Sequence, residues 1–428
     1  MAYKGERKLA SICRISDITP IEGADRIEVA HIHGWKIVVG KNEFKVGDLV
    51  VYFEIDSYLP VEPRYEFLRD RCFRVFKQHE KVFREGFRIK TCKLRGVISQ
   101  GLVMPLSAFP EITARIHHFS ESEIWYKNHV QYADKDVFVT CTKEEYKELI
   151  QEDAKKYAAE HNGEKPTYCW EMYMIENNCE LLEGANVTKL LNIDHYDEVA
   201  APFMPVSIPC GDKLSDFPSY IPKSDEERVQ NLTNPFVDYL NKDFEVTIKR
   251  DGSSLTAFYS PTYSPEQPFG VCSRNMRLKM PEGDKVSKFW DVIIKNGYDK
   301  KIIDYCKALG WELAFQGELI GPGIQGNRSL FKDFEWHIFR IWDIRFQRFV
   351  ECSARRKLCE QIGLTHVPVV EESLKVFQKF KSVDEILEYA DGKDDRGNMR
   401  EGLVFKENGT TQPVTFKAVS NKYLLKQE

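Results

Sequence analysis

The eleven cysteines of this 428-residue chain include no Cys-x-x-Cys pair and no spacing typical of a zinc site. A compact disulfide framework is also missing, because the cysteines are odd in number and scattered along a long chain. These absences exclude a zinc-knuckle protein and a disulfide-stapled secreted domain. We therefore expect reduced thiols, as in proteins inside the cell.

Long apolar runs and an excess of one charge are missing as well. The N-terminus begins with the polar segment Met1–Lys8, which lacks the apolar core of a signal peptide, and no apolar run reaches membrane-spanning length. The chain has 61 basic and 66 acidic residues, a net charge of −5. This balance does not by itself indicate nucleic acid, and we expect a protein of the cytoplasm or nucleus that is not bound to a membrane.

The length predicts two or three domains. Short candidate strands separated by glycines fill residues 9–105, a pattern typical of a small β-barrel, and the OB-fold is the candidate barrel. The pattern of short strands separated by glycines ends after that stretch. We predict an N-terminal module over 1–110, an insertion over 111–181, and a second domain over 182–428.

Two capping boxes and one linker are visible after the barrel. Thr142–Glu145 predicts the start of a helix over about 143–160, and Ser224–Glu227 predicts the start of a short helix. The stretch 201–222 is rich in proline and serine, which indicates a linker or an arm laid across a domain.

One segment of the barrel region is strongly basic. Between Arg64 and Arg95 eleven Lys or Arg residues stand against four acidic residues, with six aromatic residues among them. This composition suits phosphates and stacked bases, although an amphipathic surface segment with its aromatics in the core explains it equally well. Arg88, Lys90 and Lys93 are the candidate nucleic-acid contacts.

A single lysine ends an alternating strand pattern in the second domain. Apolar and polar residues alternate over 244–249, which predicts a strand that ends at Lys249. Asp251-Gly252 then turns the chain, and a new strand begins near Ser254. The ordinary interpretation is a plain hairpin with a lysine at its tip. The functional interpretation is that Lys249 is a nucleophile.

Further polar residues stand in apolar surroundings along the same domain. With the lysine motif they form six ordered segments: Lys249-Arg-Asp-Gly252, Ser273-Arg-Asn275, Gly317-Glu-Leu319, Trp342-Asp-Ile344, Glu401-Gly-Leu-Val-Phe-Lys406 and Phe416-Lys417. This series resembles the motifs of the covalent nucleotidyltransferases, which are the polynucleotide ligases and the capping enzymes.

Four other segments restrict the resemblance to one group of these enzymes. They are residues 7–12, 19–27, 46–57 and 217–230. With these, about residues 6–110 and 182–426 are similar to the ATP-dependent RNA ligases that carry an N-terminal OB module. The resemblance implies an α+β protein, in which an OB-like β-barrel precedes a nucleotidyltransferase domain of antiparallel sheets flanked by helices.

The resemblance also implies a covalent reaction. Lys249 would attack the α-phosphate of ATP to form lysyl-AMP, and Lys417 would hold that phosphate. Arg274 would engage the 5′-phosphate of the RNA, where a planar guanidinium suits the phosphate oxygens. Neighbouring cations, a bound metal ion and Lys417 among them, would lower the pKa of Lys249 toward its nucleophilic form. The RNA 5′-end would then be adenylated and sealed to a 3′-hydroxyl, as in nick repair.

A metal site and a nucleotide pocket follow from the same resemblance. Asp251, Glu318 and Glu401 would bind or orient Mg²⁺ or Mn²⁺, which prefer oxygen ligands. Thr247 and Trp342 would contact the nucleotide beside the catalytic and metal-binding residues. A packed tryptophan is the ordinary explanation for Trp342.

The chain departs from the family pattern at two positions. Val419 stands where some ligases have a second lysine in the last motif, so Lys422 or Lys406 would have to supply that charge. Thr247 replaces a glutamate that is frequent in DNA ligases, which leaves base recognition partly to backbone groups or to Glu245.

Other functions compete with RNA ligation. DNA ligases and capping guanylyltransferases generally have an OB domain after the last motif, whereas here the OB-like module comes first and Lys417 lies 11 residues from the end of the sequence. A nucleic-acid-binding protein with an inactive ligase domain is the alternative from another class, although every motif residue is intact.

Overall fold

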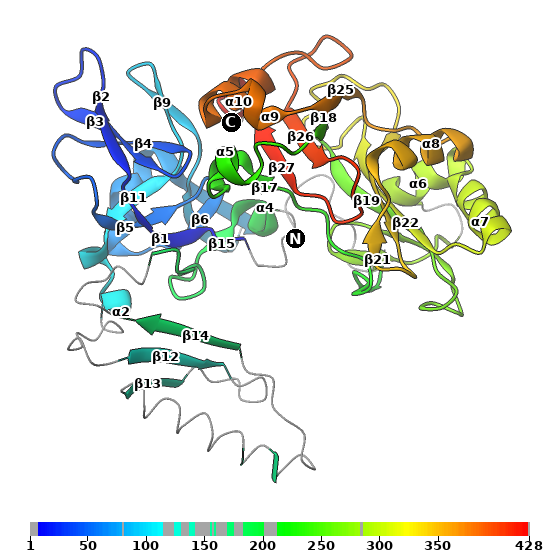
Figure 1. Ribbon diagram of the computed structural model, residues 1–428, viewed down its shortest axis with the longest axis horizontal. Helices are drawn as coiled ribbons and strands as arrows, with labels where there is room; N and C mark the ends of the chain where they lie inside the picture. Colours follow the sequence, from blue (N-terminus) through cyan, green and yellow to red (C-terminus); the bar gives the residue numbers. More distant parts are fainter. Residues whose placement is uncertain are drawn as a thin grey trace.

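The structure is a computed structural model of the chain. It describes residues 7–78, 81–113, 124–129, 137–141, 155, 158–159, 169–174, 183–200, 212–282 and 286–426. Two sheet-rich domains lie side by side, the N-terminal one in blue and cyan and the C-terminal one from green to red (Figure 1). In the part of the chain that is described, no helix is both long and apolar enough to cross a membrane.

The N-terminal domain consists of short strands, as the glycine-punctuated sequence predicts. The strands are β1 (Ala10–Arg14), β2 (Asp17–Pro20), β3 (Ile27–Ile32), β4 (Trp35–Gly40), β5 (Leu49–Phe53), β6 (Ser57–Leu59), β7 (Phe73–Gln78), β8 (Lys81–Arg88), β9 (Cys92–Leu94), β10 (Val97–Ser99) and β11 (Leu102–Pro105). The short helices are η1 (Pro63–Leu68), α1 (Arg69–Cys72), η2 (Leu106–Ala108) and α2 (Pro110–Thr113). The sheet orders are β1-β5-β11, β2-β3-β4, β10-β9 and β15-β6-β8-β7.

The core of this domain extends beyond the predicted boundary at residue 182. Val187, Leu191 and Ile193 are buried in one cluster with residues of the barrel such as Phe53. β15 (Asp194–His195) pairs with β6, and α4 (Tyr196–Ala200) follows. The chain returns to the barrel after the insertion because these apolar side chains complete its core.

The insertion contains a three-stranded sheet of its own. Its strands are β12 (Ile124–His129), β13 (Val137–Cys141) and β14 (Cys169–Met174), in the order β13-β12-β14. The helix predicted over about 143–160 falls almost wholly outside the described residues.

The C-terminal domain contains two large sheets. The seven-stranded sheet has the order β16-β21-β20-β19-β22-β23-β24, and the five-stranded sheet has the order β17-β27-β26-β18-β25. The strands are β16 (Lys213–Asp216), β17 (Glu227–Arg228), β18 (Phe244–Lys249), β19 (Ser253–Tyr259), β20 (Phe269–Cys272), β21 (Met276–Leu278), β22 (Leu313–Ile320), β23 (Glu335–Asp343), β24 (Arg348–Phe349), β25 (Val369–Leu374), β26 (Gly402–Glu407) and β27 (Thr415–Val419). The helices are η6 (Val229–Asn231), α5 (Pro235–Asp238), α6 (Lys288–Lys295), α7 (Tyr298–Leu309), α8 (Cys352–Ile362), α9 (Val376–Lys379), α10 (Val383–Ala390) and α11 (Asn421–Leu424).

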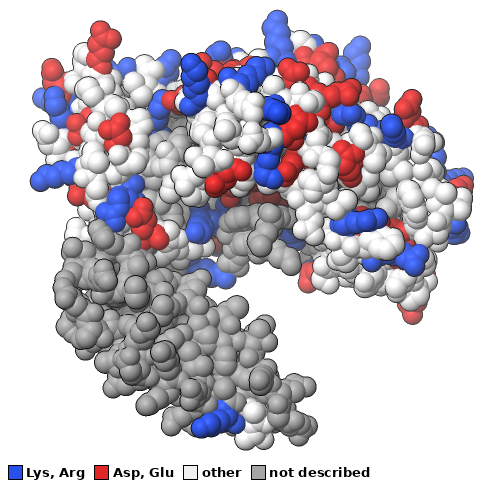
Figure 2. All heavy atoms as spheres, viewed as in Figure 1, with Lys and Arg blue, Asp and Glu red and all other residues white. Residues whose placement is uncertain are grey.

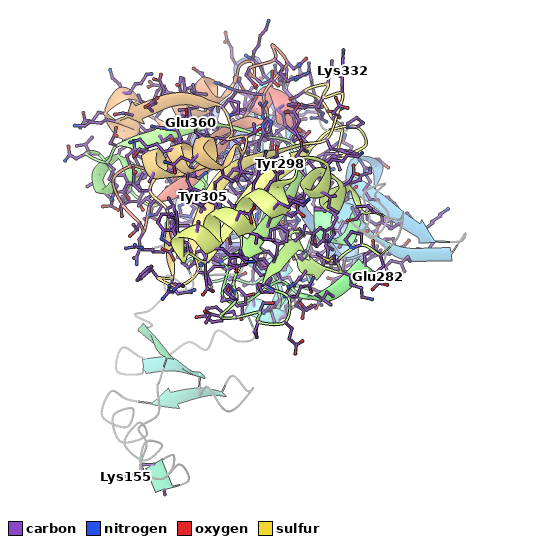
Figure 3. The ribbon with its side chains drawn as sticks, turned by 90° about the vertical axis from the view of Figure 1, so that its right-hand side faces the viewer. Lys155, Glu282, Tyr298, Tyr305, Lys332 and Glu360 are labelled. Carbon is purple, nitrogen blue, oxygen red and sulfur yellow. The ribbon has the colours of Figure 1, made fainter. Side chains whose placement is uncertain are left out.

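Helices α6, α7 and α8 pack on the seven-stranded sheet. Their apolar residues, such as Trp290 and Ile302, share a buried cluster with strand residues such as Phe315. Figure 3 looks onto these helices, with Tyr298 and Tyr305 on α7 and Glu360 on α8. α9 and α10 pack in the same way against the five-stranded sheet.

The predicted hairpin after Lys249 is wrong. β18 belongs to the five-stranded sheet, while β19 belongs to the seven-stranded sheet. Asp251-Gly252 therefore carries the chain from one sheet to the other, and Lys249 lies at their junction. The sequence could not distinguish a crossing from a hairpin, because both need a short turn between two strands.

The second capping box does not start a helix. Residues 222–226 have no regular secondary structure, Glu227–Arg228 form β17 in parallel pairing with β27, and only a 3₁₀ turn follows. The helix fails to form because Asp225 and Glu226 form ion pairs with Lys417 and Arg340 rather than capping backbone N–H groups.

Strand β18 is buried on both faces. The sequence predicts that Glu245 and Thr247 lie on a polar face, but both are at most 1% exposed. β25 and β26 pair with the two edges of the strand. Glu245 forms ion pairs with Arg355 and Arg356 of α8. Glu245 therefore holds α8 against the sheet and is not free to recognise a base.

Replacing Glu245 with alanine tests this buried ion cluster. We expect Glu245→Ala to lower the free energy of unfolding by about 3–5 kcal/mol, because Arg355 would remain buried without its partner. Denaturant unfolding followed by tryptophan fluorescence measures the change. Glu372→Ala removes an exposed partner of Arg356 and should cost at most about 1 kcal/mol. Equal losses in the two variants would contradict the assignment.

Candidate active site

Lys249 is positioned by the crossing between the two sheets. It is the last residue of β18 and lies opposite Gly402 of β26. The turn after it packs tightly on β22, since a Cβ atom at Gly252 would collide with the Leu319 carbonyl oxygen and approach Glu318 Cγ to 2.8 Å. Glycine is needed there because the two backbones approach closely.

Three carboxylates surround the lysine. Glu401, just before β26, accepts a hydrogen bond from Lys249 Nζ at 2.7 Å. Glu318 lies on β22 opposite Ser254, and its charge and that of Asp251 also act on Lys249. The structure thus brings together the predicted nucleophile and all three predicted metal-binding residues.

The charges of this cluster shift one another's protonation. Burial, together with the carboxylates of Glu401 and Asp251, raises the pKa of Glu318 to about 8 against the opposing charge of Lys249. Burial also raises the pKa of Glu401. Burial alone would lower the pKa of Lys249, but the negative charges of Glu401 and Glu318 outweigh burial and raise this pKa. The predicted lowering by neighbouring cations is therefore not produced by the side chains alone.

The carboxylate cluster fits a hard divalent cation. Glu401 Oε2 is buried and has no hydrogen-bond partner in the described structure, and every candidate ligand is an oxygen atom. No three Asp, Glu, His or Cys side chains in the described ranges converge into a complete metal site. An ion here would therefore be held by one or two carboxylates with water completing its shell, as is usual for Mg²⁺.

Lys417 and Arg274 meet at a shared carboxylate. Lys417 lies on β27 opposite Val404, and its Nζ is 2.9 Å from Asp225 Oδ1. Arg274, between β20 and β21, places Nη2 3.4 Å from Asp225 Oδ2. Burial lowers the pKa of Lys417, while Asp225 opposes that shift. Sequence reasoning missed Asp225 because its segment was interpreted as a helix cap.

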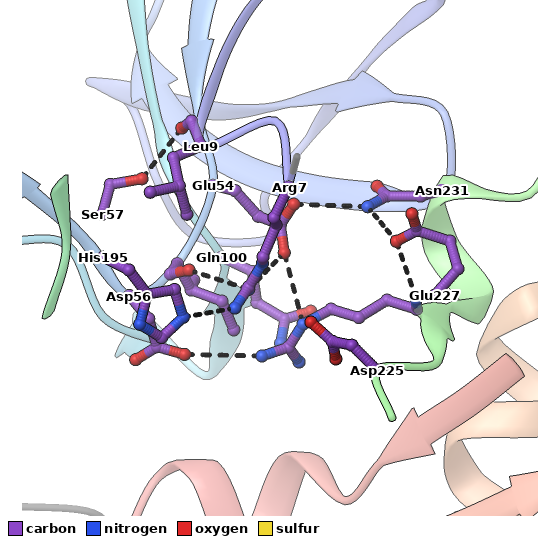
Figure 4. Close-up of polar contacts among 12 residues, drawn as sticks. Arg7, Leu9, Glu54, Asp56, Ser57, Gln100, His195, Asp225, Glu227 and Asn231 are labelled. Carbon is purple, nitrogen blue, oxygen red and sulfur yellow. Dashed lines mark hydrogen bonds and ion pairs between the residues drawn. The ribbon is translucent and has the colours of Figure 1, made fainter. Parts of the chain in front are cut away.

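A pocket between the two domains opens beside Lys417. Its lining residues are Arg7, Asp225, Glu226, Glu227, Arg228 and Lys417. Figure 4 shows Arg7 of the N-terminal domain donating to Glu54 at 2.6 Å, with His195 Nε2 also 2.6 Å from its guanidinium. Arg228 Nη1 is buried and has no hydrogen-bond partner among the described residues. An unsatisfied guanidinium nitrogen in a pocket is suited to an anionic ligand.

Thr247 and Trp342 are both packed inside the domain. The Thr247 hydroxyl faces the Val404 carbonyl oxygen at 3.5 Å. Trp342 Nε1 donates to the Tyr220 carbonyl oxygen at 3.0 Å, and its ring meets Phe349 edge-on at 4.7 Å. Trp342 is five residues along β23 from His337, the residue opposite Glu318, or about 17 Å at the usual rise of a strand. The contacts of Trp342 therefore fit the packed interpretation.

The two candidates for a second lysine are engaged elsewhere. Lys406 is buried and donates to the Phe339 carbonyl oxygen at 2.6 Å; burial and the charge of Arg355 lower its pKa to about 7. Lys422 Nζ lies 3.4 Å from Asp391 on the surface.

In the basic segment of the barrel, some cations pair with other residues of the protein, while others are exposed. Arg88 lies 3.0 Å from Asp56 and 4.0 Å above the Tyr196 ring, so it serves the structure. Lys93 is exposed and Lys90 is partly exposed. Figure 2 shows basic and acidic side chains interspersed over the visible face of the molecule. Of the three predicted contacts, Lys90 and Lys93 remain candidates.

A residue near the C-terminus joins the site to the barrel. The Tyr423 hydroxyl on α11 hydrogen-bonds the Asp251 carboxylate. The next residue, Leu424, packs into a core cluster of the N-terminal domain, where Trp35 also lies. Sequence reasoning missed Tyr423 because no motif surrounds it.

Family models and solved structures resemble this chain along its length. A model of an OB-fold domain matches residues 9–106, and a model of RNA ligases matches residues 242–423. Comparison with curated protein sequences gave no match. The OB-fold assignment of the N-terminal module is thus confirmed, as is the α+β fold with a ligase domain.

Solved structures of the Naegleria gruberi RNA ligase are similar over nearly the whole chain. A mutant with AMP and Mn has 30% identity and a TM-score of 0.71, and the match covers 98% of this chain and 99% of that one. The form with PPi has the same identity and TM-score, with 99% of each chain covered. A mutant with ATP and Mn has 30% identity and a TM-score of 0.70, covering 98% and 99%. The chain belongs to the RNA ligase family, in the branch with an N-terminal OB-fold domain.

Proposed function

We propose that this protein is an ATP-dependent RNA ligase that seals a 3′-hydroxyl RNA end to a 5′-phosphate end. The observation that carries the proposal is the placement of Lys249 at the sheet junction, hydrogen-bonded to Glu401 at 2.7 Å. A lysine held among carboxylates, with further cations nearby on β27 and after β20, suits nucleophilic attack on a phosphate. The complexes of the Naegleria enzyme with ATP, AMP and Mn support the same chemistry.

In the first step the Lys249 amine attacks the α-phosphorus of ATP. A P–N bond forms, the bond to pyrophosphate breaks, and the amine gives up its proton to become lysyl-AMP. Lys417 neutralises charge on the α-phosphate. Beside Lys417, the buried and unsatisfied Arg228 nitrogen is a further donor for an anionic oxygen of the nucleotide.

The two later steps transfer AMP and then release it. A 5′-phosphate oxygen of the RNA attacks the α-phosphorus, which frees Lys249 and leaves the RNA 5′-adenylated. The RNA 3′-hydroxyl then attacks the 5′-phosphate, a phosphodiester forms, and AMP leaves. Arg274 is 55% exposed at the rim of the site, where a planar guanidinium can hold an incoming 5′-phosphate. Sealing of nicks in RNA repair is the use that this chemistry suggests.

A divalent metal ion would be held by Glu318 and Glu401, with Asp251 orienting its water. When bound, Mg²⁺ or Mn²⁺ supplies charge stabilisation at phosphate oxygens. The chain's own contribution is the cluster of carboxylates whose charge keeps the Lys249 pKa high. A cation held by these carboxylates would neutralise that charge and so lower the Lys249 pKa toward the reactive amine.

Substrate tests separate this proposal from DNA ligation, cap formation and an inactive binding protein. Labelling with radioactive ATP or GTP, followed by a denaturing gel, reports covalent chemistry and the choice of nucleotide. Sealing of all-RNA, mixed and all-DNA nicks then reports strand preference. We expect AMP labelling and efficient sealing of RNA.

Lys249→Ala should abolish covalent AMP labelling and the sealing of 5′-phosphate RNA, because no other side chain forms the phosphoamide. RNA supplied with a 5′-adenylate should still be sealed at least partly, since the last step does not use the nucleophile. Lys295→Ala, an exposed lysine on α6, serves as the control and should label normally. AMP label on the Lys249→Ala protein would refute the assignment.

Glu318→Ala and Glu401→Ala should each lose sealing, by about two orders of magnitude or more, as expected when a metal ligand is removed. Residual activity should rise steeply with Mg²⁺ or Mn²⁺ concentration, because a weaker site needs more ion. Titration of sealing rate against metal measures this. Glu372→Ala, at an exposed glutamate, should keep the parental titration curve. Parental curves for both site variants would exclude a metal role.

Lys90→Ala combined with Lys93→Ala tests the basic segment as an RNA contact. Each lost phosphate contact should reduce the log–log salt slope of RNA affinity by roughly 0.7 to 0.9. AMP labelling should stay normal, because it needs no RNA. Salt titration of RNA binding measures the slope, with Lys295→Ala as control. An unchanged slope would mean that these lysines do not touch RNA.

A further inference from the structure

Asp225 contacts the two cationic side chains, Lys417 and Arg274, that bind phosphates in the proposed function. One oxygen lies 2.9 Å from Lys417 Nζ and the other 3.4 Å from Arg274 Nη2. The positive charges of Lys417, Arg274 and Arg7 outweigh burial and hold the pKa of the Asp225 carboxyl well below its usual range, so the group is an anion. A carboxylate that offers one oxygen to each of two cations makes the contacts that a phosphate would make.

The backbone around Asp225 is held firmly on both sides. Before it, the Pro222 carbonyl oxygen accepts from Gln316 at 2.8 Å, and Lys223 donates to Asn275. After it, Glu226 pairs with Arg340 at 2.8 Å and β17 joins the five-stranded sheet. The segment therefore delivers the carboxylate to one place, and only the side chain has to rotate to release the cations.

The ion pairs of Asp225 are accessible enough to exchange. The side chain of Asp225 is 38% exposed and that of Arg274 is 55% exposed, whereas that of Lys417 is 14% exposed. The pair with Arg274 is weak, because water and salt compete for both partners. The pair with Lys417 is open to solvent on the Asp225 side. A phosphate of higher charge can therefore replace the carboxylate, whereas a weaker anion gains little by doing so.

We propose that Asp225 is an internal phosphate mimic, which occupies Lys417 and Arg274 until a substrate phosphate displaces it. The inference rests on the proposed function, since it takes these two cations to be phosphate ligands. Asp225 thereby keeps the cations paired and aligned, and it makes entry depend on an anion that outcompetes a carboxylate. The cost is a lower affinity for ATP than the bare cations would have.

Binding of ATP to the full-length Lys249→Ala protein tests the proposal without covalent turnover. Calorimetry with Mg²⁺ present compares this background with the added change Asp225→Asn, which keeps the shape and removes the charge. We expect about three- to ten-fold tighter binding, because ATP no longer has to break the ion pair between Asp225 and Lys417. In a Lys417→Ala background the gain from Asp225→Asn should shrink, because one contested cation is gone.

Glu227→Gln is the matched control for nearby charge. Glu227 lines the same pocket, but it accepts a hydrogen bond from Asn231 and not from Lys417 or Arg274. Its neutralisation should therefore change only the general electrostatic field and tighten ATP binding by less than two-fold. Thermal unfolding of each variant reports whether the segment stays in place.

Each outcome has a separate meaning. Weaker ATP binding by Asp225→Asn, or a gain no larger than that of Glu227→Gln, would overturn the phosphate mimic and leave Asp225 as a support for Lys417. If Lys417→Ala alone leaves ATP affinity unchanged, the proposed role of Lys417 fails instead. Tighter binding by Asp225→Asn, with the gain lost in the Lys417→Ala background, supports both.

Discussion

The passage of the chain between the two sheets at Asp251 and Gly252 is the constraint on which the site depends. Lys249 ends a strand of one sheet, and Glu318 lies on a strand of the other. The turn between the sheets tolerates no side chain at Gly252, because Leu319 and Glu318 lie directly against it. The proposed nucleophile and a proposed metal-binding carboxylate are therefore fixed relative to each other by backbone packing rather than by flexible side chains.

The N-terminal domain takes part in the same arrangement. Leu424 is buried among barrel residues, while the neighbouring Tyr423 bonds Asp251 beside Lys249. Arg7 reaches the pocket next to Lys417, although it precedes the first strand of the barrel. Lys36 and Asp384 add an ion pair across the interface at 2.6 Å. The barrel thus completes the wall of the site, and its removal would expose Leu424 and open that wall.

The sequence predicted the barrel strands well, and its motifs selected residues that the structure places together, because both depend on local patterns. Alternation and glycine punctuation identify strands such as β3 and β5, and short motifs mark Lys249, Glu318 and Glu401. It could not predict contacts made over long separations. The sequence predicted Asp225 to cap a helix, but in the structure it pairs with Lys417. It predicted Arg88 to contact RNA, but Arg88 pairs with Asp56. A one-dimensional pattern shows which residues are charged, not which charges are already neutralised.

That distinction separates two of the buried charge clusters in the described part of the ligase domain. Glu245 is fully buried, yet two arginines of α8 satisfy both of its oxygens, so the cluster has no capacity left for a ligand. At the junction, Glu401 keeps one buried oxygen without a hydrogen-bond partner in the described structure, and the pKa of Glu318 rises to about 8. Burial is common to both clusters, so burial alone does not identify a site. The carboxyl groups at the junction make it the better candidate, because folding leaves an oxygen of Glu401 unsatisfied and a cation can satisfy it.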